Sequence, residues 1–310
     1  MSRLATTLCG VPLRNPIVAA AGTAGYGPEI AEVVPPSTFG AITTKSITPE
    51  CREGNDPWRV TDLPAGMFNA IGLANVGLER FMSEVLPELA GLDTVIVGSI
   101  AGHELRDYVE VASAFGGPDA ACLRLVELNV SCPNTSTGRQ FGDDPGMLAE
   151  VVSEVVAVLQ GKPLLVKLSP GSPDPVGLAE VAVRSGAAGL TVSNTMPAMA
   201  IDPETRRSRI GRAAGGLSGP AIHPIAVRLV HEVHRRLAQS DSSVPIVGLG
   251  GVLSWRDAAE FTLAGAQVVG VGTGLFVDPR IPARLVKGID RWVRRQGAAS
   301  IDELVGGFES

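Results

Sequence analysis

The run Leu164-Leu165-Val166-Lys167-Leu168 is short, apolar at consecutive positions and interrupted by a single lysine. A strand buried on both faces has such a continuous run, whereas a half-exposed strand alternates apolar and polar residues. We therefore expect a buried parallel strand here, with Lys167 near its end. The run decides the fold because runs of the same kind recur along the chain.

Seven further runs share this apolar character, and each is separated from the next by enough chain for a helix. They are Ile17–Ala21, Ala41–Lys45, Thr94–Ser99, Leu125–Val130, Gly189–Ser193, Pro245–Leu249 and Val268–Val271. Amphipathic stretches between them predict helices at Leu78–Leu89, Pro145–Leu159, Pro175–Ser185, Ile222–Ala238 and Trp255–Leu263. Asp143 or Asp144 is a candidate N-cap for the second of these, with Pro145 in its first turn.

Eight alternations of strand and helix favour an α/β fold, a closed (β/α)8 TIM barrel. An open doubly wound sheet is the alternative that this pattern leaves. No linker or shift of composition divides the chain, so we expect residues 1–310 to form a single domain. Leu4–Arg14 predicts a small N-terminal hairpin that closes the bottom of the barrel.

The overall charge argues against a nucleic-acid partner. The chain carries 26 lysine and arginine residues against 32 acidic ones, a formal net charge of −6. Its densest basic stretch, Arg206 to Arg212, is more simply a solvated loop.

The opening residues contain no apolar signal core, and no apolar run is long enough to span a membrane, so we expect a cytoplasmic protein without a membrane partner. The four cysteines form no metal-binding pattern with the histidines, and no metal site is predicted.

Polar and glycine-rich residues gather just after the predicted strands, where a barrel enzyme has its active site. The strands at Pro245–Leu249 and Val268–Val271 lead into Gly250-Gly251 and Gly272-Thr273-Gly274. Loops at these two positions of a barrel commonly bind a phosphate through backbone N–H groups. A dinucleotide fingerprint is a weak alternative because the third glycine spacing is missing.

Lys167 is predicted to point into a barrel that is otherwise apolar, and an unpaired buried ammonium is unfavourable. An anionic cofactor would offset this cost, and so would a salt bridge inside the barrel. Flavin mononucleotide (FMN) satisfies the first alternative and the phosphate loops together, because it has one phosphate and a ring that becomes negative on reduction.

Four motifs carry a resemblance to a known family. Glu127-Leu128-Asn129-Val130-Ser131-Cys132-Pro133-Asn134 resembles the active-site signature of dihydroorotate dehydrogenases, and Asn69-Ala70-Ile71-Gly72-Leu73 resembles their substrate loop. Ser193-Asn194-Thr195 and Gly215 to Pro220 match further motifs of the family. The similarity runs over essentially the whole chain in the same order.

The resemblance implies an FMN-dependent enzyme that oxidises dihydroorotate to orotate in pyrimidine biosynthesis. Residues expected to hold the substrate are Lys45, Asn69, Ala70, Ile71, Gly72, Leu73, Asn129, Asn134, Asn194 and Thr195. Residues expected to hold FMN are Ala21, Gly22, Lys45, Ser99, Asn129, Lys167, Ser193, Gly219, Gly250, Gly251, Gly272 and Thr273. Cys132 is the expected general base, opposite the flavin. Ser99 and Ala21 depart from the pattern, since relatives usually have asparagine and frequently serine there.

The electron acceptor is predicted from the base and from the following loop. Quinone-linked relatives have a serine base and a helical extension, which this sequence lacks. Thr135–Asp143 is predicted to be a lid that excludes water. The stretch from Thr135 to Gly142, with Lys45-Ser46-Ile47-Thr48 earlier in the chain, is more similar to NAD-linked (class 1B) enzymes than to fumarate-linked (class 1A) ones. Class 1B enzymes work with a subunit that carries FAD and a [2Fe–2S] cluster, and a homodimer core is expected. Another flavin barrel, acting on a dihydropyrimidine such as dihydrouracil, is the remaining enzymatic alternative. A barrel that binds flavin or pyrimidine without turnover is the non-enzymatic one.

Overall fold

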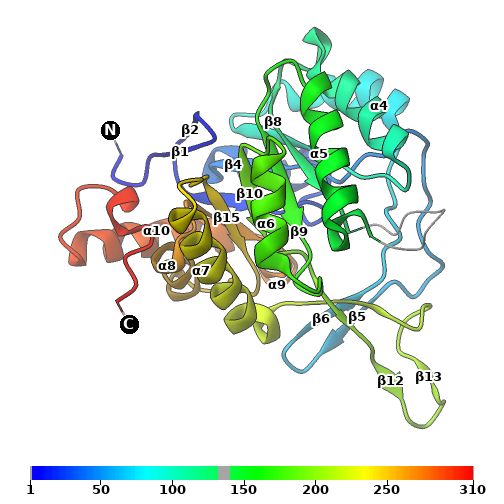
Figure 1. Cartoon of the computed structure of the whole chain (residues 1–310). Helices are drawn as coiled ribbons and strands as arrows, with labels where there is room; N and C mark the ends of the chain where they lie inside the picture. The colour runs from blue at the N-terminus through cyan, green and yellow to red at the C-terminus, as the bar shows by residue number, and fades with distance from the viewer. Residues whose placement is uncertain (1, 132–139, 310) are drawn as a thin grey trace.

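Eight parallel strands close into a barrel, as the recurrence of apolar runs predicts. The computed structural model describes residues 2–131 and 140–309 (Figure 1). Around the barrel the strands follow the order β10-β15-β16-β3-β4-β7-β8-β9. They are β3 (Ile17–Ala19), β4 (Ala41–Thr43), β7 (Val95–Ile100), β8 (Leu123–Asn129), β9 (Leu164–Leu168), β10 (Gly189–Val192), β15 (Ile246–Leu249) and β16 (Val268–Val271). The closed barrel is confirmed and the open sheet is excluded.

Helices cover the outside of the barrel. They are α1 (Pro28–Ala31), α2 (Leu78–Arg80), α3 (Leu86–Leu89), α4 (Leu105–Gly116), α5 (Pro145–Val158), α6 (Pro175–Arg184), α7 (His223–Gln239), α8 (Trp255–Ala264), α9 (Thr273–Val277) and α10 (Ile281–Arg295). Short 3-10 turns are η1 (Pro36–Thr38), η3 (Pro118–Ala120), η4 (Phe141–Asp143), η5 (Pro220–Ile222) and η6 (Ile301–Leu304). Asp144 caps α5 by accepting bonds from the N–H groups of Gly146 and Met147.

The helix predicted over Leu78–Leu89 is not one regular helix. Its middle, η2 (Phe81–Val85), is a π-helical turn between α2 and α3. Pro87 explains the change, since its ring cannot approach the carbonyl four residues earlier in a regular α-helix. The sequence reading also missed α4 and α10.

A hairpin at the N-terminus closes the end of the barrel where the strands begin. It consists of β1 (Thr6–Leu8) paired antiparallel with β2 (Val11–Leu13). Leu8, Val11 and Leu13 pack in one buried cluster with Val18, Ala41, Val97, Leu125, Leu165, Val247 and Val268 from the barrel strands. The predicted hairpin is confirmed at the predicted end.

Two long segments, one after β4 and one after β10, leave the barrel and form a second sheet that the sequence analysis did not predict. Its strands are β5 (Val60–Leu63), β6 (Gly66–Asn69), β14 (Gly215–Ser218) and β11 (Met196–Ala198), all antiparallel. A smaller hairpin, β12 (Ile201–Asp202) with β13 (Arg207–Ser208), contains the first arginines of the basic stretch, and Figure 1 shows it projecting from the body with β5 and β6. Arg206 and Arg207 are exposed, in agreement with the predicted solvated loop.

Candidate active site

Neighbouring strands bring the predicted polar residues together at the rim where the strands end. In the register of the barrel, Asn129 on β8 is opposite Lys167 on β9, and Lys167 is opposite Thr191 on β10. Ser193 and Asn194 follow β10 directly, and the backbone N–H of Asn194 donates to the carbonyl of Leu168. Parallel strands therefore place the motif that contains Asn129 and the motif that contains Asn194 on either side of Lys167.

An amide cluster, made of Asn129, Ser131 and Asn194, joins these two motifs. The Asn194 Nδ2 group donates to Asn129 Oδ1 at 3.1 Å and to Ser131 Oγ at 2.9 Å. The backbone N–H of Thr195 donates to Asn194 Oδ1 at 2.8 Å, so this side chain is held at both ends. Ser131, which the prediction did not include, belongs to the cluster and is the last described residue before Cys132.

Lys167 has a carboxylate partner inside the barrel. Its Nζ lies 3.7 Å from Glu127 Oε1, and both side chains are buried. Thr191 Oγ1 donates to Glu127 Oε2 at 2.8 Å, while Glu127 Oε1 makes no hydrogen bond. The salt-bridge alternative is therefore present, and burial of the lysine alone does not require an anionic cofactor.

Lys45 follows β4 at the same rim. Its ammonium lies 5.7 Å from the centre of the Tyr26 ring. Burial lowers the pKa of Lys45, partly opposed by the nearby Glu29 carboxylate. On the next strand, Ser99 is completely buried and its hydroxyl lies 2.8 Å from the Ser46 hydroxyl. The serine that departs from the family pattern is thus already hydrogen-bonded within the protein.

The predicted substrate loop, Asn69–Leu73, begins at the end of β6 in the second sheet. Asn69 Nδ2 donates to the carbonyl of Gly216 at 3.2 Å. Thr195 packs against the same glycine so closely that a Cβ on Gly216 would lie 2.1 Å from Thr195 Oγ1. The second sheet is therefore what brings this loop beside Thr195 and the amide cluster.

Two asparagines that sequence reasoning missed hold this loop. Asn55 donates from its backbone N–H to the carbonyl of Ile71 and from Nδ2 to that of Ala70, each at 3.0 Å. Asn75 Nδ2 donates to the Leu73 carbonyl at 2.8 Å and to Thr48 Oγ1 at 2.8 Å. These bonds connect the loop to the segment that carries Lys45. No sequence periodicity indicated them, because they are local contacts of irregular chain.

The predicted phosphate-binding glycines also converge. A Cβ on Gly251 would lie 2.8 Å from the carbonyl oxygen of Gly219, and Gly251 has a left-handed φ of +70°. Thr273 Oγ1 donates to Ser218 Oγ at 2.7 Å, and Gly272 faces the turn Ala20 to Thr23 that contains Ala21 and Gly22. The loops after β15 and β16, the Gly219 turn and the turn after β3 thus form one continuous glycine-rich wall.

Two predicted residues, Cys132 and Asn134, lie outside the described residues. So does most of the predicted lid. Its end is described: the Gly142 N–H donates to the Val130 carbonyl at 3.0 Å, and Ser172 Oγ donates to Asp143 Oδ1 at 2.7 Å. The end of this segment is therefore anchored directly to the segment that follows β8.

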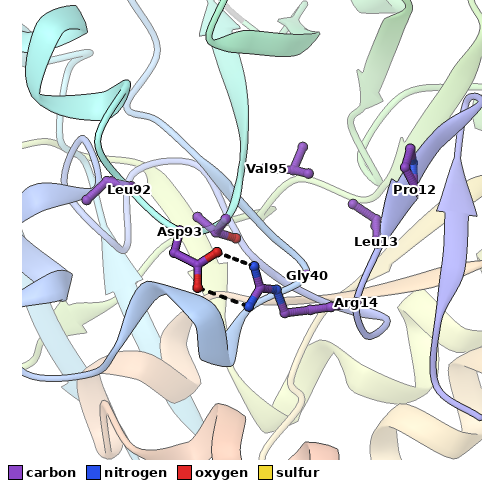
Figure 2. Close-up of a pocket in the computed structure, with 8 residues that line it drawn as sticks. Pro12, Leu13, Arg14, Gly40, Leu92, Asp93 and Val95 are labelled. Atoms are coloured by element: carbon purple, nitrogen blue, oxygen red, sulfur yellow. Dashed lines mark hydrogen bonds and ion pairs between the residues drawn. The ribbon is translucent and has the colours of Figure 1, made fainter. Parts of the chain in front are cut away.

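A surface pocket of about 480 Å³ lies at the opposite end of the barrel from this rim. Figure 2 shows Arg14 facing Asp93 there, with guanidinium–carboxylate bonds of 2.5 and 3.3 Å. None of the predicted site residues lines this pocket. This pocket therefore does not coincide with the predicted site.

A barrel with buried polar groups and glycine-rich loops at the ends of its strands defines a (β/α)8-barrel enzyme. Comparison with known proteins adds the family: a dihydroorotate dehydrogenase family model matches residues 3–293. The chain therefore belongs to the dihydroorotate dehydrogenase family, whose members are flavin-dependent oxidoreductases.

Individual relatives carry two kinds of name. A protein of Solibacter usitatus, provisionally named dihydroorotate dehydrogenase A (fumarate), is 46% identical over 98% of both chains. A protein of Geotalea daltonii, named dihydroorotate dehydrogenase B (NAD(+)), catalytic subunit, is 41% identical over 99% of this chain and 98% of that one. A crystal structure of dihydroorotate dehydrogenase from Eimeria tenella with ferulenol shares the fold, with a TM-score of 0.80 at 21% identity over 98% of this chain and 88% of that one. Among the described residues, no helix is long and apolar enough to cross a membrane.

Proposed function

We propose that this chain is the catalytic subunit of an NAD-linked dihydroorotate dehydrogenase, with FMN as its cofactor and Cys132 as its general base. The observation that carries the proposal is the meeting of Asn129, Ser131 and Asn194 at the strand ends beside the buried Lys167. A single cluster of amides at a barrel rim is suited to a small ring with imide groups.

The substrate side is argued from donor and acceptor chemistry. Dihydroorotate presents ring amides and a carboxylate. Asparagines offer a donor and an acceptor at once, which suits the ring amides, and the Lys45 ammonium suits the carboxylate. The loop Asn69–Leu73 would cover the ring, since Asn55 and Asn75 hold it against the same rim.

The glycine-rich wall fits FMN. Gly219 and Gly251 approach each other so closely that side chains are excluded, which leaves backbone N–H groups accessible to a phosphate. When bound, FMN accepts the hydride. Lys167 would lie near the ring, where its charge favours negative charge on the flavin, while Glu127 keeps the ammonium compensated in its absence.

Cys132 would take the proton that dihydroorotate loses from the carbon next to the hydride donor. A thiolate is a competent base, and an ordinary thiol with a pKa of about 8.5 reaches that form only with help or at higher pH. The chain brings Cys132 directly after Ser131, a member of the amide cluster. We propose that the loop Thr135–Asp143 excludes water during this transfer.

The proposed partner subunit depends on the NAD-linked class, and the cysteines of the chain support it. A [2Fe–2S] cluster needs four closely arranged thiolates. Cys9 lies in the N-terminal hairpin, Cys51 is exposed after β4, and Cys122 precedes β8. Electrons destined for NAD would therefore leave through a second protein carrying FAD and the cluster. The homodimer core, the single FMN domain over residues 1–310 and the cytoplasmic location stay predictions of the sequence.

A fumarate-linked, class 1A enzyme is the second candidate, because the Solibacter usitatus relative carries that name. An enzyme acting on dihydrouracil is a further alternative, against which the substrate loop argues.

The decisive experiment loads the purified chain with FMN and adds dihydroorotate without oxygen. The flavin absorbance should bleach with dihydroorotate and not with dihydrouracil. Failure to bleach would leave a binding protein instead of an enzyme. Reoxidation is then assayed with NAD, fumarate and a quinone, alone and with any subunit that co-purifies from the native host. Turnover with NAD only in the presence of that subunit supports class 1B, and fumarate turnover by the chain alone refutes it.

A further inference from the structure

His223, the first residue of α7, connects that helix to the turn after β15. Its Nδ1 lies 2.8 Å from the carbonyl oxygen of Gly250. A carbonyl oxygen only accepts hydrogen bonds, so Nδ1 carries the proton. On the other side of the ring, Nε2 lies 3.2 Å from Glu260 Oε2 on α8. The Glu260 side chain is mostly exposed, so solvent screens this second contact.

The ring is closely packed as well as hydrogen-bonded. It meets the Phe261 ring edge to face, with the ring centres 5.1 Å apart, and its side chain is only 12% exposed. A Cβ on Gly251 would lie 2.8 Å from the His223 Cβ, and one on Gly250 would lie 2.7 Å from the Ala226 Cβ. The first turn of α7 and the Gly250-Gly251 turn are therefore in direct contact.

The peptide bond between Gly250 and Gly251 connects the His223 contact to the proposed phosphate site. In a trans peptide the C=O and the next N–H point in opposite directions. When His223 holds the Gly250 carbonyl toward α7, the Gly251 N–H is directed away from α7. That N–H belongs to the turn through which we propose the FMN phosphate is bound.

We propose that His223 is a positioning residue for FMN: it fixes the orientation of the Gly250-Gly251 peptide through its hydrogen bond to the Gly250 carbonyl. The proposal rests on the proposed function, since it takes this turn as the phosphate site. Without the bond, the flexible glycine peptide is free to rotate, and binding must order it.

The test compares two substitutions that separate the hydrogen bond from the ring. H223N keeps a donor near the Nδ1 position and loses the ring, whereas H223F keeps a ring against Phe261 and loses the donor. The dissociation constant of FMN is measured with the apoprotein by quenching of flavin fluorescence. We expect H223F to bind FMN about tenfold more weakly, the usual effect of one lost hydrogen bond, and H223N to stay within about threefold of the unsubstituted chain.

Weak binding by H223N together with normal binding by H223F would overturn the proposal, because the ring alone would then matter. Equal binding by all three proteins would overturn it too. E260Q, which retains the bond to Gly250, is the matched control and should change binding by less than about threefold. If H223F does not fold by circular dichroism, H223N and E260Q still decide: a tenfold loss in H223N refutes the proposal. If the unsubstituted chain binds no FMN, the proposed function itself fails, which is a distinct result.

Discussion

The two ends of this barrel are built from the same strands and differ in chemistry. At the end where the strands begin, Leu8 and Leu13 of the hairpin close the barrel with apolar side chains. At the end where they finish, Lys167, Glu127 and Thr191 form a buried polar group beside the amide cluster. The same closed sheet therefore carries stability at one end and chemistry at the other, as expected for this fold.

Cysteines show the same contrast. At the bottom, burial raises the pKa of Cys9 to about 12, and its Sγ donates to the carbonyl of Ala188. Such a thiol is chemically inert and acts as a small apolar group. Cys132 lies outside the described residues, but in the sequence it comes directly after Ser131, a member of the amide cluster. The proposed role as base therefore concerns Cys132 and not Cys9.

The largest expected effect is on catalysis at the rim. Replacing Cys132 by alanine should slow reduction of bound FMN by dihydroorotate by about 10² to 10⁴-fold, because a positioned base is lost. Anaerobic stopped-flow absorbance measures the rate, and FMN content should not change. Cys51→Ala, at an exposed cysteine, is the control. Unchanged kinetics in Cys132→Ala would remove this residue from the mechanism.

Substitution of Lys167 at the rim should also lower the free energy of unfolding, because it breaks the buried ion pair with Glu127. Lys167→Ala leaves Glu127 buried without its counter-charge, which typically destabilises by about 3–5 kcal/mol, and FMN retention should weaken. The double substitution Lys167→Met with Glu127→Gln removes both charges and should recover much of the stability. Urea unfolding measures the free energy of unfolding of the single and the double variant. Equal losses in the single and double variants would show that the pair contributes through packing alone.

A substitution at the end of the barrel where the strands begin should lower the free energy of unfolding without affecting the candidate site. Leu8→Ala creates a cavity in the hairpin cluster and should destabilise by about 3 kcal/mol in urea unfolding. The affinity for FMN and the rate of flavin reduction should stay within error of the unsubstituted chain. Thr7→Ala, on the exposed side of the same strand, should change neither. A slower reduction in Leu8→Ala would mean that the two ends are coupled.

The smallest effect concerns pH and Lys45. Since burial lowers the pKa of Lys45, the ammonium loses its proton at a lower pH than an ordinary lysine. The affinity for orotate, a carboxylate, should therefore fall by about tenfold as pH rises through that pKa. Flavin absorbance titrations with orotate measure it. Lys45→Arg keeps its charge at all these pH values, so its affinity for orotate should not fall with pH. An identical fall in Lys45→Arg would mean that another group causes the pH dependence.

Much of the barrel could be predicted because its strands leave a local signal. Continuous apolar runs marked all eight strands, with ends misplaced by at most two residues. Lys45 was predicted within β4 and lies outside it, since its N–H bonds to the Gly25 carbonyl instead of to the sheet. The second sheet was missed because β14 begins with two glycines, carries no apolar pattern and pairs with β6, about 150 positions earlier.

The sequence by itself determined the eight apolar strands, the polar residues that follow them and an aspartate cap of α5 at position 143 or 144, since each depends on residues that are neighbours in the chain. Only the tertiary structure decided that Glu127 neutralises Lys167, that His223 reaches Gly250, and that Asn55 and Asn75 hold the predicted substrate loop. The first two contacts join residues that are distant in the sequence and that meet only when neighbouring strands and helices pack together. The bonds of Asn55 and Asn75 to the loop are local, but they lie in irregular chain that leaves no periodic pattern. Many residues of the candidate site were already evident in the sequence, and the folded chain added Ser131, Asn55 and Asn75 to them.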